Sequence, residues 1–385
     1  MQDNHSLTAR EAAERLGVKL ETLYAYVSRG RLRSVPVSGS RERRYRPEDI
    51  DALQAARGAP RGGVAPAAQP PSPVIDSSIS LIEGGRLYYR GRDVLRLSDR
   101  ASLEEIAALL WNEPDGGAFD ATAAPAPPRG GELQAHSIER CQIRLAEMAA
   151  ADPEALDLKR ARVARAGRGI LAELIAAAGG YRTLSAPVHR RLASGWGLDD
   201  AGADILRRSL VLLADHELNP STFVARCVAS TGATPYAVVS AALGALSGRR
   251  HGGAAIHVAE LFRELARGGD PMIAMAERLA HGEALPGIGH PLYPDGDPRA
   301  VAILYAVSAI APQARRFVRW QPNVDFALAA ATTALGLPPD AALALFAIGR
   351  TVGWIAHAIE QYDSGVPIRP RARYTGPRPE GSPGP

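Results

Sequence analysis

The sequence predicts a mainly α-helical protein with little β-sheet, and three observations point to this fold class. The chain has 385 residues, and 46% of them are hydrophobic, which is enough for a sizeable core. Aromatic residues are sparse at 5%, whereas alanine and leucine are abundant, and these two lose little freedom in a helix. Apolar residues recur every three or four positions, as on the buried face of a helix, in nine segments: 102–111, 160–178, 203–213, 220–230, 235–247, 254–266, 298–311, 326–335 and 341–364.

The N-terminal part is expected to be built around two short helices. Thr8 can cap a helix over residues 9–16, where Glu11 completes a capping box and Gly17 ends the helix. A second short helix is expected near residues 21–28. Two short helices joined by a tight glycine turn form the helix-turn-helix pattern.

A two-stranded wing and a last short helix are expected to complete this head. Residues 32–45 contain alternating, β-favouring positions around a turn at 38–40, which is typical of a hairpin. Pro47 then opens a helix over residues 48–56, because proline is favoured in the first helical turn. The sequence therefore predicts a small winged helix-turn-helix domain.

The chain is expected to divide into three parts. The head spans residues 1–57, and residues 58–74 are a linker, because proline, glycine and alanine dominate there without a hydrophobic period. The module of residues 75–385 begins with a strand-like segment at 77–90 and continues with the predicted helices. A second stretch of this composition, 114–131, interrupts the module and is expected to be a mobile loop.

Cysteine content and hydropathy argue against several classes of protein. Only Cys141 and Cys227 are present, with no CxxC pair, so neither a disulfide framework nor a structural metal site is expected. The N-terminus is polar and has no apolar signal core, and no uninterrupted apolar stretch reaches about 18 residues. We therefore expect a cytoplasmic protein that does not span a membrane.

Positive charge is concentrated in the head, although the net charge of the whole chain is only +4. Such a run is often only a solvated face, and it indicates an acidic partner only where the fold supports one. A single acid, Glu42, stands among seven arginines, at positions 29, 31, 33, 41, 43, 44 and 46.

The head resembles the DNA-binding domains of the MerR and excisionase type, through LTAREAAERLGVKLETLYAYVSRGRL followed by RRYRPEDIDAL. In such domains the second helix enters the major groove and the wing contacts the backbone. A single copy would bind weakly, so a dimeric module would help by supplying two half-sites. The alternative is a helix-turn-helix kept only as a docking surface. If DNA is bound, the resemblance places Lys19, Thr22, Tyr24 and Tyr26 near the groove and Arg41, Arg43 and Arg44 on phosphates.

The module carries histidines, arginines and an aspartate at helix breaks, whereas no phosphate-binding loop or serine-nucleophile elbow is present. These residues occur in five segments: ADHELNPSTF with His216, RRHGGAAIHVAELF with His251, LPGIGHPLYPDGDPRA with His290 and Arg299, NVDF with Asp325, and FAIGRTVGWIAHAIEQ through IRPRARYTGP with Arg350, Arg369 and Arg371.

Each of these residues taken alone has a structural explanation. A histidine at a helix end is more often a satisfied structural residue than a catalytic one. Arg350, within apolar surroundings, is typical of an ion-pair anchor, and Asp325 is most simply an N-cap. The order and spacing of the whole set leave these explanations little room.

The five segments, in this order, closely resemble citrate synthases. The likeness spans roughly residues 75–377 and begins at SSISLIEGGRLYYRGRDVLRL. It implies a helical enzyme that condenses acetyl-CoA with oxaloacetate and hydrolyses the citryl thioester to citrate and CoA. It also implies a large domain at about 75–250 and 331–385, a small domain at about 251–330, and a homodimer. No cofactor would be bound permanently, because the coenzyme A thioester is a co-substrate.

The resemblance implies a role for each matching residue. Asp325 would remove a proton from the acyl carbon, and His251 would hydrogen-bond the thioester oxygen as it becomes an enol. His290 would polarise the keto group of the acceptor. His216, Arg299 and Arg350 would bind the carboxylates of the oxo acid, and Arg369 would bind the oxo acid of the second subunit. Asn323 would lie close to CoA, although it could equally be an ordinary turn residue.

Elementary chemistry agrees with these roles. The charge that develops on the thioester oxygen needs a hydrogen-bond donor, and Gly252 and Gly253 would let the chain turn sharply so that His251 stands at a helix N-terminus. Because that position disfavours a positive imidazole, we expect His251 to be uncharged. Arginine forks suit the two carboxylates of the oxo acid. Three arginines in one empty pocket are costly, so the oxo acid is expected to bind first and close the site.

Two positions depart from the family pattern. Many relatives have arginine directly after the loop histidine, where this chain has Pro291. The usual Tyr-Ser-Gly-like stretch after the aspartate is Ala-Leu-Ala here, at residues 327–329. We expect both changes to affect acyl selectivity and the way CoA is held.

Two other functions remain open from the sequence. The first is a 2-methylcitrate synthase that uses propionyl-CoA, a donor that differs by one methyl group, which a pocket discriminates by only about 1–3 kcal/mol. The second is a DNA-binding regulator whose module senses oxaloacetate, citrate or an acyl-CoA without turnover. Asp325 argues against a pure sensor, because binding needs the arginines but not a carbon base.

Overall fold

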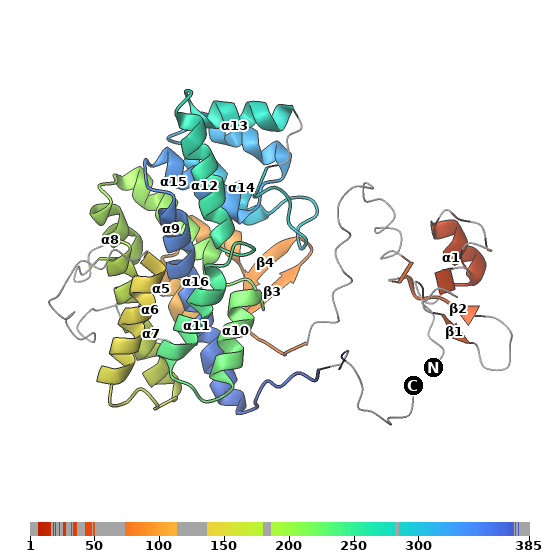
Figure 1. Cartoon of the computed structure of the whole chain (residues 1–385), viewed down its shortest axis with the longest axis horizontal. Helices are drawn as coiled ribbons and strands as arrows, with labels where there is room; N and C mark the ends of the chain where they lie inside the picture. The colour runs from red at the N-terminus through yellow and green to blue at the C-terminus, as the bar shows by residue number, and fades with distance from the viewer. Residues whose placement is uncertain are drawn as a thin grey trace. The chain divides into compact units, whose positions relative to one another are not determined.

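The computed structural model describes most of the module and parts of the head. The chain divides into two compact units, Met1–Val74 and Ile75–Pro385, both drawn in Figure 1. The expected loop at 114–131 and residues 58–73 of the expected linker lie outside the described residues. The described residues are 74–113, 137–179, 186–281, 285–372, 374 and 376, and in the head 7–16, 18, 20, 23, 26, 27, 32, 34–36, 43–47, 49 and 50.

The head begins with the predicted capped helix. Helix α1, Ala9–Leu16, has Thr8 as its cap: Glu11 N donates to Thr8 Oγ1 at 3.3 Å, and Thr8 N donates to Glu11 Oε2 at 2.7 Å. This reciprocal pair is the capping box that the sequence predicts. The apolar face of α1 forms part of a small core. This core consists of Ala12, Ala13 and Leu16 from α1 together with Leu23, Leu32, Tyr45 and Ile50.

The predicted wing is also confirmed where the structure describes it. Strand β1, Val35–Pro36, pairs antiparallel with β2, Arg43–Arg44. Residues 20, 23, 26 and 27 are helical, as the predicted second helix requires, and so are residues 47, 49 and 50 of the last one.

The second unit opens with a small antiparallel sheet, in agreement with the predicted strand-like start. Strands β3 (Ser80–Glu83), β4 (Arg86–Tyr89) and β5 (Arg92–Asp93) pair in the order β3-β4-β5. Asp93 then caps α4 (Val94–Arg100), because its side chain accepts from two backbone N–H groups of the first turn.

Helices form the rest of this unit, so the predicted fold class is confirmed. Each of the nine predicted segments contains a helix, although α14 ends at Val307 and not near residue 311. The helices after α4 are α5 (Leu103–Trp111), α6 (Ser137–Ala151), α7 (Arg160–Ala177), α8 (Val188–Gly195), α9 (Asp200–Leu213), α10 (Pro220–Ala229), α11 (Pro235–Leu246), α12 (Gly253–Ala266), α13 (Pro271–Ala280), α14 (Pro298–Val307), the 3-10 helix η2 (Pro312–Trp320), α15 (Val324–Ala334) and α16 (Asp340–Ser364).

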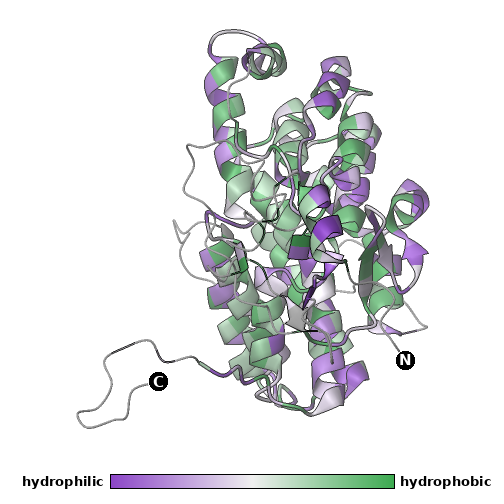
Figure 2. Ribbon diagram, turned by 90° about the vertical axis from the view of Figure 1, so that its right-hand side faces the viewer, coloured by the Kyte–Doolittle hydropathy of each residue, from purple (hydrophilic) through white to green (hydrophobic). Residues whose placement is uncertain are grey.

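Helix α16 is the central element of the core. It packs against α5, α7, α9, α10, α11 and α12, and the same helices surround it in Figure 1. Among the described residues it is the one helix long and apolar enough to cross a membrane, but that apolar stretch is wholly buried inside the protein. Its hydrophobicity therefore serves the core. Figure 2 shows the same distribution, with hydrophobic segments inside the helical body and hydrophilic ones toward its outside.

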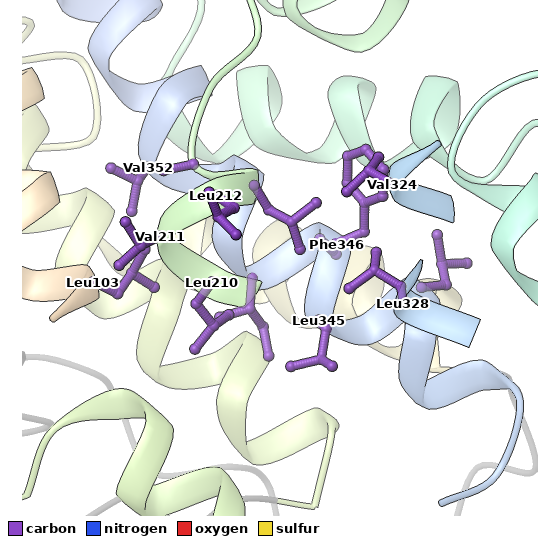
Figure 3. Packing of buried hydrophobic residues seen from close by; sticks show 14 of the residues in the cluster. Leu103, Leu210, Val211, Leu212, Val324, Leu328, Leu345, Phe346 and Val352 are labelled. Carbon is purple, nitrogen blue, oxygen red and sulfur yellow. The ribbon is translucent and has the colours of Figure 1, made fainter. Parts of the chain in front are cut away.

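Two glycines bring α16 unusually close to the end of α9. A Cβ atom at Gly349 would lie 2.9 Å from Cβ of Leu213, and one at Gly353 would lie 2.4 Å from the carbonyl oxygen of Ala214. Such distances leave no room for any side chain. The approach buries Arg350, which stands between the two glycines, directly beside the chain that follows α9. Figure 3 shows side chains of α9, α15 and α16 packed together in this region.

Candidate active site

A cavity of about 460 Å³ lies where the C-terminal end of α9 meets the N-terminal ends of α12, α14 and α15. It collects six of the eight residues to which the sequence assigns catalysis or substrate binding: His216, His251, His290, Arg299, Asp325 and Arg350. They come from five segments that are far apart in the chain. The other lining residues include Glu217, Leu218, Asn219, Pro220, Arg250, Pro291, Leu292, Val324 and Phe346.

The loop that carries His216 is held by strand β3. Ser80 Oγ donates to Oδ2 of the fully buried Asp215 at 2.5 Å and accepts from the backbone N–H of Glu217 at 3.0 Å. Glu217 adopts a left-handed backbone with φ 50°, and its Oε1 accepts from Ile82 N at 2.8 Å. A left-handed non-glycine residue persists only where its surroundings enforce it. The sheet thus fixes the backbone on both sides of His216.

His216 itself contacts a tyrosine that the sequence analysis did not single out. Its Nε2 lies 2.9 Å from the hydroxyl of Tyr293. Burial lowers the pKa of His216 well below its ordinary value, and the cations Arg299 and Arg350 lower it further. Burial raises the pKa of Tyr293 to about 12. At neutral pH the pair therefore consists of an uncharged imidazole and a protonated phenol.

His251 stands directly before Gly252, the N-cap of α12. Its Nε2 lies 2.8 Å from Oγ of Ser221, and its ring meets the ring of Phe346 edge-on at 5.8 Å. Burial lowers the pKa of His251 to about 4, and Arg350 lowers it further. The uncharged state agrees with the sequence-based expectation, and burial is its largest cause.

The two glycines after His251 lie where the chain turns from α11 into α12, as the sequence predicts. Gly252 is part of this turn, with φ −54° and ψ −28°. A Cβ at Gly252 would lie 2.6 Å from Cδ1 of Leu246, and one at Gly253 would lie 2.5 Å from the carbonyl oxygen of Ser247. Glycine is therefore needed because the start of α12 packs directly on the end of α11.

His290 lies in a loop that two left-handed glycines shape, Gly287 with φ 82° and Gly289 with φ 79°. Its Nδ1 accepts the backbone N–H of Leu292 at 3.1 Å. In the neutral ring the proton therefore sits on Nε2, which makes that atom a donor. Burial lowers the pKa of His290, with a further contribution from Arg299, so the neutral form is favoured.

Arg299 is buried in the first turn of α14 and is held by the acid that caps the same helix. Its Nε donates to Asp297 Oδ1 at 3.0 Å and its Nη2 donates to Asp297 Oδ2 at 2.8 Å. The same Oδ2 accepts the backbone N–H of Val324 at 3.2 Å, at the start of α15. Asp297 therefore orients Arg299 and joins two helices that border the cavity.

Arg350 is buried at 1% exposure without an ion-pair partner among the described residues. Its Nε donates to the carbonyl oxygen of Leu213 at 2.7 Å, while its Nη1 is buried with no hydrogen-bond partner. Burial lowers the pKa of Arg350 to about 10, against the opposing effect of Asp215. The interpretation of Arg350 as an ion-pair anchor is therefore wrong, because no acid of the described residues forms an ion pair with it.

Asp325 is the second unsatisfied charged group of the cavity. The N-cap of α15 is Asn323, whose Oδ1 accepts from the backbone N–H groups of Asp325 and Phe326 at 3.1 and 3.3 Å. The simple interpretation of Asp325 as the cap is therefore wrong. Its Oδ1 is buried without a partner, and burial raises the pKa of Asp325 to about 7, although Arg299 and Arg350 oppose the shift.

Two predicted residues do not line this cavity. Asn323 caps α15, and its Nδ2 donates to the carbonyl oxygen of Gly289 at 3.3 Å. Arg369 is exposed on the segment after α16, which leaves the body at the end opposite α13 in Figure 1. Among the described residues no group of three or more metal-ligating side chains is present.

Sequence reasoning missed three polar residues that contact the predicted ones: Tyr293, Ser221 and Asp297. Tyr293 and Asp297 belong to the same sequence motif as His290. Their closeness to His290 in the sequence was the one signal that could have identified them. Ser221 follows the Asn-Pro helix start and was indistinguishable there from an ordinary first-turn serine.

The cavity defines a class of enzyme. A carboxylate with one buried, unpartnered oxygen can remove a proton from carbon, and uncharged imidazoles can donate to the oxygen on which charge develops. Two buried guanidinium groups suit an anionic substrate. The fold and the site together are those of a helical enzyme that activates a carbon acid next to a carbonyl group.

Comparisons with known proteins identify the family. Residues 71–371 match the family described as "Citrate synthase, C-terminal domain". A citrate synthase of Haloferax volcanii is 32% identical over 372 residues, which cover 79% of this chain and 93% of that protein. A 2-methylcitrate synthase of Corynebacterium glutamicum is 29% identical, covering 78% and 92%. The crystal structure of citrate synthase from Thermotoga maritima superposes with a TM-score of 0.65 at 27% identity, covering 81% and 96%. The chain belongs to the citrate synthase family.

The head also matches a known family, because residues 6–58 correspond to a helix-turn-helix domain. Arg43 is exposed on β2, and its Nε donates to Ser34 Oγ at 2.7 Å. Arg44, the next residue, is half-buried, and Tyr26 packs its ring partly against the small core. The other predicted DNA contacts, Lys19, Thr22, Tyr24 and Arg41, lie outside the described residues.

Proposed function

We propose that this chain condenses acetyl-CoA with oxaloacetate and hydrolyses the citryl thioester, releasing citrate and CoA. One observation carries the proposal: Asp325 Oδ1 and Arg350 Nη1 are buried without partners in a cavity that also holds three uncharged histidines. Leaving buried charged groups unsatisfied costs several kcal/mol. A substrate that offers both an acidic carbon and a carboxylate removes that cost.

Asp325 is assigned the role of base toward the methyl group of acetyl-CoA. A carboxyl group with a pKa near 7 is a much stronger base than an ordinary aspartate, yet is largely deprotonated above neutrality. His251 is assigned the donor to the thioester oxygen. Its Nε2 lies 2.8 Å from Oγ of Ser221, a hydroxyl that donates to Oδ1 of Asn219 at 2.9 Å, so the His251 ring is held at the wall of the cavity.

His290 is assigned the donor to the keto oxygen of oxaloacetate. Its Nδ1 is occupied by a backbone N–H, which leaves Nε2–H as the donor. The enol carbon attacks the polarised keto carbon, and the keto oxygen takes up a proton as the carbon–carbon bond forms. Water then cleaves the thioester, and the carboxylates of the oxo acid are bound by His216, Arg299 and Arg350.

We further propose a cytoplasmic homodimer in which Arg369 completes the site of the second subunit. Arg369 is exposed and does not line the cavity of its own chain, so it is available to a neighbouring copy. Asn323 is assigned a place near CoA, and residues 251–330 are assigned to a small domain that closes over the bound oxo acid. Light scattering that finds a monomer under assay conditions would contradict the dimer.

The test is release of the CoA thiol, measured with oxaloacetate and either acetyl-CoA or propionyl-CoA. We expect release to require both substrates and to be faster, by kcat/KM, with acetyl-CoA. Because the donors differ by one methyl group, the preference should not exceed roughly 200-fold. A reversed preference would identify a 2-methylcitrate synthase, and no release from either donor would favour a metabolite sensor.

We propose DNA binding as a second function of the head. The helix-turn-helix match and the arginine-bearing strand β2 support it.

We expect the full chain to shift a duplex of mixed sequence in a gel, with an affinity for the duplex that falls steeply as the salt concentration rises. Replacing Arg43 and Arg44 by glutamine should reduce the slope of log affinity against log salt by roughly 1 for each lost phosphate contact. Arg100→Gln, on α4 of the second unit, is the control. An affinity insensitive to salt would exclude phosphate contacts.

A further inference from the structure

We propose that Tyr293 is a positioning residue of the active site: its phenol donates a hydrogen bond to Nε2 of His216 and thereby fixes the ring orientation and tautomer with which His216 meets the oxo acid. The inference rests on the proposed function, because it assigns His216 to that substrate. Tyr293 itself is 2% exposed and does not belong to the cavity lining.

Tyr293 is placed by the loop that also carries His290. Its backbone N–H donates to the carbonyl oxygen of His290 at 3.0 Å, which closes a tight turn. The turn brings the tyrosine ring to 5.0 Å from the His290 ring, and the guanidinium of Arg299 lies over the tyrosine ring at 5.6 Å. One side chain therefore contacts three residues that line the cavity, and among the described residues its hydroxyl forms a hydrogen bond with His216 alone.

The direction of the hydrogen bond follows from the acidities of the two groups. The phenol keeps its proton at neutral pH, because burial raises its pKa to about 12. A neutral imidazole nitrogen is a better acceptor than a phenol oxygen, and a phenol is a stronger acid than a neutral imidazole N–H. The proton of Tyr293 is therefore donated to Nε2 of His216, and the ring proton of His216 sits on Nδ1.

The surroundings of His216 keep it an acceptor. Burial is the largest cause of its lowered pKa, and four groups lower it further: Arg299 from α14, Arg350 from α16, His290 from the loop before α14 and His251 from the turn before α12. A donor at Nε2 stabilises the neutral ring in addition. Removing that donor should therefore raise the pKa of His216 and allow both tautomers.

The bond also joins two separate parts of the site. His216 belongs to the loop between α9 and α10, which is hydrogen-bonded to Ser80 of β3. Tyr293 belongs to the loop before α14. No second hydrogen bond to His216 Nε2 is present among the residues that the structure describes. We expect the loss to appear in oxaloacetate binding, because the acyl carbon is handled by other residues.

The test uses Tyr293→Phe, which removes only the hydroxyl and keeps the ring against His290 and Arg299. The matched control is Tyr305→Phe, on the exposed face of α14. Loss of one hydrogen bond predicts a rise of roughly 3- to 10-fold in KM for oxaloacetate, with KM for acetyl-CoA changed less than 2-fold and kcat reduced less. The control should leave all three constants unchanged.

A second measurement is independent of activity. In protein labelled with ¹⁵N-histidine, the signal of His216, assigned by its loss in His216→Gln, should show an unprotonated Nε2 in the wild type. In Tyr293→Phe it should show a mixture of tautomers and titrate at higher pH. A protonated Nε2 in the wild type, or an unchanged KM for oxaloacetate in an active Tyr293→Phe enzyme, would overturn the assignment. If the wild type releases no CoA, the proposed function fails, while the ¹⁵N signals still decide the hydrogen bond.

Discussion

Replacing Asp325 by asparagine is expected to reduce kcat for CoA release by about 10²- to 10⁴-fold, the usual contribution of a general base. Asparagine has nearly the same volume and can remain in the first turn of α15, but it cannot accept a proton. Its amide can also occupy a site where Oδ1 is now buried without a partner. Oxaloacetate should therefore still bind, and its affinity can be measured by calorimetry.

Asp340→Asn is the matched control for this substitution. Asp340 also stands in the first turn of a long helix, α16, but is exposed and remote from the cavity. It should lose only the small interaction of a carboxylate with a helix N-terminus, about 0.3–1 kcal/mol of stability. Full activity of Asp325→Asn would refute the assignment of the base, and equal losses in both variants would indicate a general effect on folding.

The pH dependence of the wild-type enzyme follows from the same group. Burial raises the pKa of Asp325 to about 7, and only the deprotonated carboxylate can act as a base. The acid limb of kcat/KM for acetyl-CoA should therefore fall as pH drops through about 7, and not near the ordinary aspartate value of about 4. A rate independent of pH between 5 and 8 would contradict the raised pKa.

The helices of this protein were largely predictable, and four were missed. Long helices that face the core on a wide stripe, such as α9 and α16, reveal themselves by apolar spacing. Helices α4 and α8 were missed because they have only 7 and 8 residues, and α6 because charged residues stand between its apolar ones. Helix α13 was missed although it has 10 residues, as many as the predicted α10 and α14.

The candidate site was predictable as a set of residues but not as a set of contacts. Motif order named six residues that the fold brings to one cavity. The partners of those residues depend on segments that meet only in three dimensions, such as Ser80 with Asp215, which are 135 positions apart. The same holds for the burial that makes His251 neutral and Asp325 basic. The local sequence carries no information on these long-range contacts or on the burial of these side chains.

Replacing Arg350 by glutamine is expected to weaken oxaloacetate binding by about 2–5 kcal/mol, or ~30- to ~4,000-fold, because a buried charge pair with the substrate is lost. The free energy of unfolding of the ligand-free enzyme should fall far less than the free energy of oxaloacetate binding. Arg350 Nη1 has no partner in the free protein, so the desolvated guanidinium is already costly there, and a glutamine amide can still donate to the carbonyl of Leu213.

Thermal unfolding with and without oxaloacetate separates these two effects. Wild-type protein should gain about 2.7 kcal/mol of stability when oxaloacetate is present at 100 times its Kd. Arg350→Gln should unfold close to the wild-type temperature without ligand and gain almost nothing at the same oxaloacetate concentration. Arg208→Gln, on the outer side of α9, should keep the full gain, because Arg208 pairs with Asp99 and Asp204 outside the cavity. An undiminished gain in Arg350→Gln would mean that the unpaired guanidinium of α16 is not the anion site, and the unsatisfied Nη1 would then be a structural cost that this fold tolerates without using it.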